Sequence, residues 1–118
     1  MPDNRLQTQI YLRFLNLLKT ARTLPGFVDL DPLEERLLNL FATVWHADQK
    51  ITVLKAMVIC TDVSTTTIHR RLKSLRAKGV IVLVNDEIDT RIKYVTPTKI
   101  AFQHFAQLGQ CMEEAKSS

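Results

Sequence analysis

Residues 5–22 carry apolar side chains at helical spacing, and no glycine or proline interrupts them. One stripe consists of Leu6, Ile10, Phe14, Leu17 and Ala21, and a second group, Tyr11, Leu12, Leu15 and Leu18, widens it. This periodicity predicts an amphipathic helix that ends before Leu24-Pro25-Gly26. Since more than one side of the helix is apolar, we expect it to pack against several partners, among them a second copy of the chain.

A second helix is predicted from about residue 32 to Trp45. Asp31 is suited to cap this helix, Pro32 suits its first position, and Glu34 lies three residues after the cap, as in a capping box. Apolar residues then recur at the spacing of a buried face: Leu33, Leu37, Leu40, Phe41 and Val44. Polar residues 46–50 form the connection that follows.

Two further helices are predicted close together in the next part of the chain. Ile51 suits a strand of one or two residues, and Thr52 can cap a short helix over about residues 53–60. After a turn at residues 61–63, Ser64 is placed to cap a helix that runs from Thr65 to Lys78. This second helix is expected to stop at Gly79.

A hairpin and a last helix complete the pattern. Residues 80–84 are apolar and mostly β-branched, which favours a strand, and residues 91–96 are the returning strand. The polar residues 85–89 form the tip between them. We expect Pro97 to open a final helix that reaches about Ala115. The order of elements predicts a single domain over residues 1–118, of class α+β and mainly α.

Charge is unevenly distributed along the 118 residues, whose formal net charge is +4. Residues 1–63 carry no net charge, whereas residues 64–99 hold eight basic and three acidic residues, a net charge of +5. Such a concentrated basic segment is typical of a surface that attracts phosphate groups, although a solvated helix face has the same composition. No apolar run is long enough to span a membrane, and we expect no membrane partner.

The helix over residues 65–78 has two contrasting faces at 100° per residue. Ile68, Leu72 and Leu75 form a stripe that should face the core, and the opposite stripe contains Thr66, Arg70 and Lys73. Thr65, Thr67, His69 and Arg71 flank that polar stripe. Hydroxyl and guanidinium groups suit base edges in a major groove, and the free N–H groups after Ser64 suit a phosphate. The alternative is a surface helix whose threonines serve only as caps.

Several motifs resemble the MarR family of winged helix-turn-helix regulators over about residues 30–105. They are Leu30-Asp31-Pro32, the segment Val63 to Ile68, the segment Leu75 to Ile81, Asp89-Thr90-Arg91 and Val95-Thr96. The resemblance implies a winged helix-turn-helix core over residues 31–96, with dimerisation helices over 5–24 and 98–115. It also implies that Arg91 and Lys93 reach the minor groove or the neighbouring backbone, and that Asp89 holds the wing in shape.

Some positions depart from the family pattern. Asp86 and Glu87 make the predicted wing tip acidic, and Lys99-Ile100 stands where the family usually has glycine. The chain is short for the family, with little room for a further helix. A small-molecule effector therefore has no support in the sequence.

Catalytic and metal-binding patterns are not found in the sequence. His46, His69 and His104 are not spaced as metal ligands, and Cys60 and Cys111 form no recognisable metal or redox pair. No nucleophile elbow, glycine-rich phosphate loop or HExxH segment occurs. We therefore expect neither an enzyme nor a cofactor.

The function predicted from the sequence is a cytoplasmic transcriptional regulator that binds palindromic double-stranded DNA as a homodimer. The acidic wing tip leaves open a winged-helix module that binds protein instead of DNA. A replication or partition protein of a mobile element, with the same fold, is the third alternative.

Overall fold

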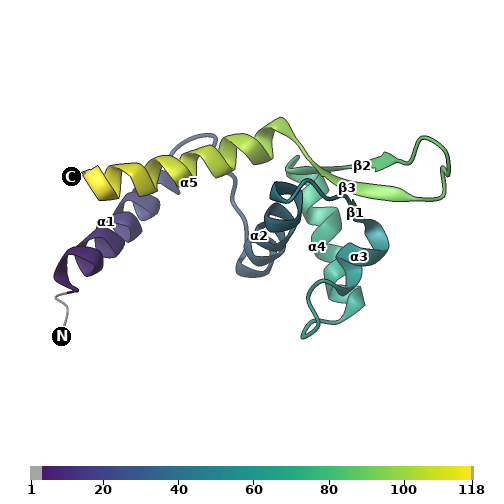
Figure 1. Ribbon diagram of the computed structural model, residues 1–118, viewed down its shortest axis with the longest axis horizontal. Helices are drawn as coiled ribbons and strands as arrows, with labels where there is room; N and C mark the ends of the chain where they lie inside the picture. The colour runs from purple at the N-terminus through teal and green to yellow at the C-terminus, as the bar shows by residue number, and fades with distance from the viewer. Residues whose placement is uncertain (1–3, 118) are drawn as a thin grey trace. The chain divides into compact units, whose positions relative to one another are not determined.

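The computed structural model describes residues 4–117, and local sequence signals explain where most of its elements begin and end. The elements in chain order are α1 (Arg5–Ala21), α2 (Pro32–His46), β1 (Ile51–Thr52), α3 (Val53–Val58), α4 (Thr65–Ala77), β2 (Ile81–Asn85), β3 (Lys93–Pro97) and α5 (Lys99–Ser117) (Figure 1). Side chains of Asp31, Thr52 and Ser64 accept a backbone N–H three residues later and so cap α2, α3 and α4. The predicted class, α+β and mainly α, is confirmed.

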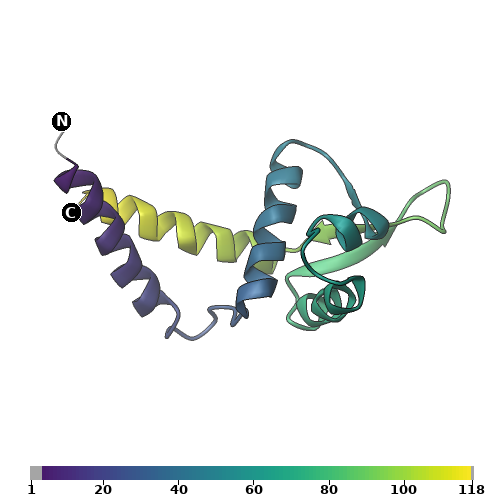
Figure 2. The same cartoon turned by 90° about the horizontal axis from the view of Figure 1, so that it is seen from below.

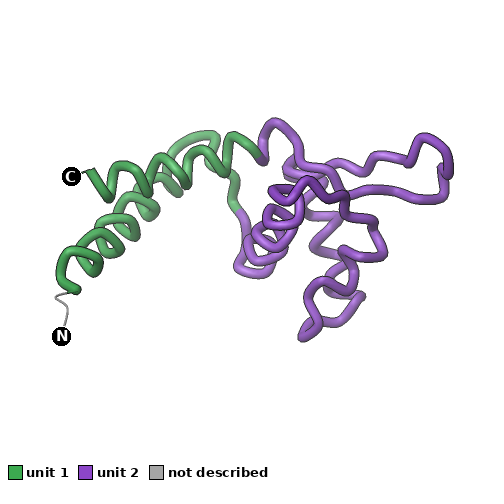
Figure 3. Tube along the Cα trace, in the orientation of Figure 1, with its two compact units in different colours: residues 1–29, 102–118 green, residues 30–101 purple. Residues whose placement is uncertain are grey.

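The chain divides into two compact units (Figure 3). Unit 1 comprises residues 1–29 and 102–118, and unit 2 comprises residues 30–101. Helix α5 begins in unit 2 and continues into unit 1. Within residues 4–117, no helix combines the length and the apolar character needed to cross a membrane.

Unit 2 has a core formed by α2, α4 and one face of a small sheet. The sheet is antiparallel with strand order β1-β3-β2. Its buried side chains include Ile51, Ile81 and Val95. The helices contribute Leu37, Leu38 and Phe41 from α2 and Ile68, Leu72 and Leu75 from α4, all buried. The outer part of the β2–β3 hairpin projects beyond the helices of this unit in both views (Figures 1 and 2), as the wing of a winged helix.

Unit 1 brings together helices from the two ends of the chain. The Arg13 Nε donates a hydrogen bond of 2.9 Å to the Ala115 carbonyl, which ties α1 to the last turns of α5. The ring of Phe27 meets the buried His104 ring edge-on, with 5.2 Å between the centroids. The apolar stripe of α1 is only partly covered, since Leu6, Tyr11 and Leu12 remain exposed.

The start of the last helix differs from the sequence prediction. Pro97 is the last residue of β3, where it pairs with Ile81, and α5 begins at Lys99. The Thr98 hydroxyl accepts the Ala101 N–H at 3.3 Å, so Thr98 caps the helix. The prediction that Pro97 opens the helix is wrong because a proline at the end of a strand needs no ladder donor, whereas threonine supplies the cap.

Replacing Gly79 with alanine should destabilise unit 2. Gly79 has φ +79°, and a Cβ added there would lie 3.1 Å from the Ile100 Cδ1. The left-handed backbone costs an L-residue about 1–2 kcal/mol, and the close approach to Ile100 adds to that cost. Gly26 has φ +86° with nothing within 4 Å of an added Cβ, so Gly26→Ala isolates the backbone cost. Urea denaturation should give the larger loss for Gly79→Ala, and equal losses would contradict the Ile100 contact.

Candidate nucleic-acid interface

Helices α3 and α4 form the helix-turn-helix of unit 2, and α4 begins with a well-defined cap. The Ser64 Oγ accepts the Thr67 N–H at 3.2 Å and donates to the Thr67 Oγ1 at 2.9 Å. The Ser64 and Thr67 hydroxyls are therefore hydrogen-bonded to each other. Thr65 and Thr66 are exposed. Of the four hydroxyl residues predicted to bind DNA, Thr65 and Thr66 are the exposed pair that lies outside this Ser64–Thr67 contact.

The two faces of α4 lie as the periodicity predicts. Ile68, Leu72 and Leu75 are buried, and Thr66, Arg70 and Lys73, which we call the recognition face, are exposed. His69 is exposed as well. A further cation that was not among the predicted site residues, Arg76, is exposed on the next turn and lines a hollow with Lys73 and Val82. Arg76 follows Lys73 by about one helical turn, and this spacing in the sequence is the signal that predicts Arg76 beside the recognition face.

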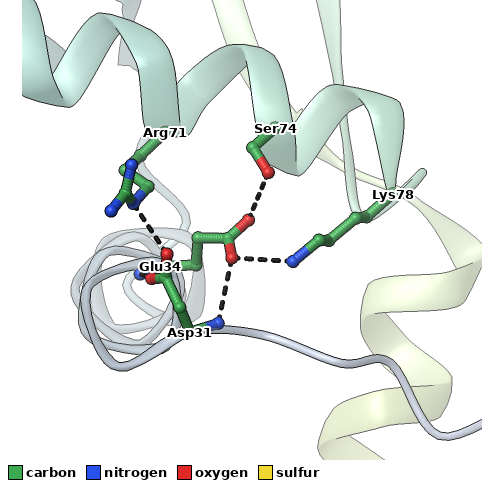
Figure 4. A network of polar contacts seen from close by, with 5 residues as sticks. All are labelled: Asp31, Glu34, Arg71, Ser74 and Lys78. Atoms are coloured by element: carbon green, nitrogen blue, oxygen red, sulfur yellow. Dashed lines mark hydrogen bonds and ion pairs between the residues drawn. The ribbon is translucent and has the colours of Figure 1, made fainter.

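Arg71 lies differently from the other cations of α4. Its Nε is 2.8 Å from the Asp31 Oδ2, at the N-terminus of α2 (Figure 4). The structure therefore brings Arg71 to a carboxylate of its own unit, and not to the recognition face. A guanidinium held in this way fixes α4 against α2.

Glu34 completes this contact between α2 and α4 (Figure 4). Its carboxylate, 2% exposed, accepts hydrogen bonds from the Asp31 N–H at 2.9 Å, the Ser74 hydroxyl at 2.7 Å and the Lys78 ammonium at 2.7 Å. Burial acts to raise the pKa of Glu34, but these three donors outweigh it and lower the pKa overall. We call Asp31, Glu34, Arg71, Ser74 and Lys78 the α2–α4 clamp.

A second polar contact stabilises the turn before α4. The Arg36 guanidinium donates two hydrogen bonds to the Asp62 carboxylate, at 3.0 and 2.9 Å, and these lower the pKa of Asp62 to about 2. The Cys60 thiol donates to the same carboxylate at 3.3 Å. Burial and this hydrogen bond raise the pKa of Cys60, so its thiol is held in the unreactive protonated form.

The tip of the wing is organised by Asp86. Its carboxylate accepts the N–H groups of Ile88 and Asp89, at 3.0 and 2.9 Å, and the Tyr94 hydroxyl at 2.7 Å. These hydrogen bonds, led by the one from Asp89, lower the pKa of Asp86. The acidic residue that departs from the family pattern is therefore an acceptor within the loop. We call this set of contacts the wing lock.

Asp89 and Arg91 form a compact ion pair on the same loop. The Asp89 carboxylate accepts the Arg91 N–H at 3.1 Å and both the Nε and an Nη of its guanidinium at 3.0 Å. The Arg91 side chain is nonetheless 89% exposed. Lys93, at the start of β3, is exposed too. Asp89 thus orients a solvent-facing guanidinium beside the wing.

The wing lock should be visible in the titration of Tyr94. The chain has two tyrosines, so Tyr11→Phe leaves Tyr94 as the sole phenol. Its hydrogen bond to Asp86 raises the pKa of Tyr94, because the carboxylate accepts from the phenol and would repel the phenolate. This stabilisation is present below the ordinary phenol pKa, about 10, and is lost as the pH rises through the raised value. Phenolate absorbance should therefore titrate higher in Tyr11→Phe than in Tyr11→Phe/Asp86→Asn; identical curves would contradict the lock.

Within residues 4–117, no three His, Cys, Asp or Glu side chains lie close enough together to hold a metal ion. The expectation that the chain needs no metal or cofactor stays an expectation.

Comparison with solved structures identifies the fold. The chain is similar to the transcriptional regulator Tm0710 from Thermotoga maritima, with a TM-score of 0.59 and 13% identity over 94% of this chain and 70% of that one. It is similar to the heme sensor protein PefR from Streptococcus agalactiae (TM-score 0.57, 20% identity, covering 99% and 78%) and to MarR from E. coli (TM-score 0.51, 20% identity, covering 99% and 78%). No protein-family model and no curated protein matches the sequence. The predicted MarR-type winged-helix fold is confirmed.

Proposed function

We propose that this chain, with its MarR-type winged-helix fold, is a cytoplasmic transcriptional regulator that binds double-stranded DNA as a homodimer. One observation carries the proposal: Thr66, Arg70 and Lys73 are exposed on the side of α4 opposite to its buried stripe. A helix that presents guanidinium, ammonium and hydroxyl groups on a rigid scaffold suits the major groove. The basic segment over residues 64–99 supplies attraction to phosphates.

The proposed contacts divide into two kinds. Thr66, Arg70 and Lys73 would face base edges, with Thr65, His69 and the N–H groups after Ser64 beside them at the sugar-phosphate backbone. Arg91 and Lys93 would contact the minor groove or its phosphates, and Asp89 would keep the Arg91 guanidinium oriented. Thr67 forms a hydrogen bond with Ser64, and Arg71 forms an ion pair with Asp31, so these two residues would act by fixing α4.

Homodimerisation is proposed through unit 1. Its helix α1 exposes several large apolar side chains, namely Leu6, Tyr11, Leu12 and Leu15. A groove of about 340 Å³ in the same unit is lined by Gln7, Ile10, Tyr11, Phe14, Met112 and Ala115. Exposed apolar surface of this kind marks an interaction site. A two-fold dimer would bind a palindrome whose half-sites lie about one helical turn apart.

Fluorescence anisotropy tests this proposal directly. The protein is titrated against the intergenic DNA upstream of its own gene and against a scrambled duplex, at several salt concentrations. We expect preference for the native fragment and an affinity that falls steeply with salt, followed by a symmetric footprint. Equal affinity for both fragments would favour the mobile-element protein. No binding at low salt would overturn the DNA-binding proposal and favour a module that binds protein.

A further inference from the structure

Unit 2 contains a hollow that is lined by residues of α2, of the α2–β1 connection and of all three strands of the sheet. Its volume is about 490 Å³, and it is bordered by the end of α2, the α2–β1 connection and the outer half of the wing. This volume lies within the range of small-molecule sites, about 300–1,000 Å³. The proposed DNA-binding groups, on α4 and at Arg91 and Lys93, are not among its lining residues.

Two aromatic rings line the hollow, and hydrogen bonds hold both in place. The Trp45 indole N–H donates to the Val95 carbonyl at 3.1 Å, and its ring lies 5.9 Å from that of Phe41. The Tyr94 hydroxyl donates to Asp86. Val84 and Ile88 add apolar surface, and both are exposed to solvent. The walls are therefore formed in advance, which lowers the entropic cost of binding a ligand.

The charges around the hollow favour a positively charged ligand. The ionisable side chains of its lining are Lys50, Asp86, Glu87 and Tyr94, and with Tyr94 neutral they sum to −1 in a chain of net charge +4. The Lys50 Nζ already lies 4.9 Å from the centroid of the Tyr94 ring, as a cation over a π-face. Asp86 remains charged while it accepts three hydrogen bonds, because each of them stabilises the ionised form.

We propose that this hollow binds small aromatic organic cations. The ligand's rings would lie against Trp45 and Tyr94, and its charge would be balanced by Asp86 and Glu87. Lys50, whose side chain is exposed, would move away from the Tyr94 ring and make room for the ligand. An aromatic anion of the same shape would meet two carboxylates and should bind weakly.

Tetraphenylphosphonium and tetraphenylborate, which share a shape and differ in charge, test the site. Trp45 is the chain's one tryptophan, so its fluorescence reports on this hollow without interference from the apolar surface of unit 1. Titration of the full chain in the absence of DNA should give a saturable change with the phosphonium and a much weaker one with the borate. Because no DNA is present, the result is independent of the proposed regulatory function.

Two charge substitutions sharpen the test. Glu87→Gln should weaken phosphonium binding about threefold, because it removes one exposed attractive charge. Lys50→Gln should strengthen binding by about the same factor, since it removes the competing cation. Glu113→Gln, at an exposed position on α5, should leave binding unchanged. No saturable response, equal binding of the borate, or an unchanged affinity in Glu87→Gln would each overturn the proposal.

Discussion

Replacing Glu34 with alanine is expected to lower the free energy of unfolding by about 1–3 kcal/mol, the cost of leaving hydrogen-bond donors beside a buried position without their acceptor. The substitution deprives the Asp31 N–H, the Ser74 hydroxyl and the Lys78 ammonium of their acceptor at once. It also leaves a cavity between α2 and α4. Chemical denaturation followed by Trp45 fluorescence, which reports from unit 2, measures the loss.

Glu34→Gln separates the charge from the shape. Glutamine fills the same volume and retains one acceptor oxygen, so its loss of stability should be smaller than that of Glu34→Ala. The wild-type pH dependence should follow the same carboxylate. Since the folded pKa of Glu34 is depressed, its contribution is present above the unfolded value, about 4.3, and is lost as the pH falls through the folded value. An alanine variant as stable as the wild type would show that the α2–α4 clamp contributes nothing.

Arg70→Ala should weaken binding of the native DNA site by roughly 1–3 kcal/mol and reduce the preference over scrambled DNA. The reason is that a guanidinium on the recognition face can donate two hydrogen bonds to a guanine, which no other exposed group on α4 replaces at that position. Anisotropy titrations of both fragments at one salt concentration provide the measurement. This prediction depends on the proposed function.

Two control variants distinguish base recognition from simple loss of charge. Lys93→Ala should weaken both fragments alike and reduce the dependence of affinity on salt, as expected for a phosphate contact. Lys19→Ala removes the same charge from α1, where the proposal places no DNA, and should change neither property. If Arg70→Ala behaved like Lys19→Ala, the proposed orientation of α4 on DNA would be wrong.

Local signals made most of the fold predictable from the sequence. Asp31, Thr52 and Ser64 cap helices because each hydroxyl or carboxylate satisfies an N–H only three residues away. The burial of Ile68, Leu72 and Leu75 follows from helical spacing alone. Boundaries where two local signals compete were harder, and at Pro97 and Thr98 the threonine cap determined the helix start.

Long-range contacts account for what the sequence could not predict. The capping box around Glu34 is predictable from the sequence because its residues are neighbours in the chain. The hydrogen bonds that Glu34 accepts from Ser74 and Lys78 span 40 and 44 residues, and no local pattern indicates them. For the same reason helical spacing groups Arg71 with the DNA-facing cations, although Asp31 lies beside it in the fold. The sequence reveals only the charge of Asp86, because its partner Tyr94 comes close only when the hairpin pairs Val84 with Tyr94.

The way unit 1 is assembled has a consequence for protein synthesis. The Arg13–Ala115 hydrogen bond joins residues that are 102 positions apart, while unit 2 is one continuous segment between them. On the ribosome, α1 therefore emerges before unit 2, and α5 becomes available to it only after unit 2 has been translated. During that interval the apolar side of α1 lacks α5 as a partner, and unit 2 can fold first. A nascent chain stalled before α5 should accordingly engage holdase chaperones through α1, and release from them should coincide with completion of α5.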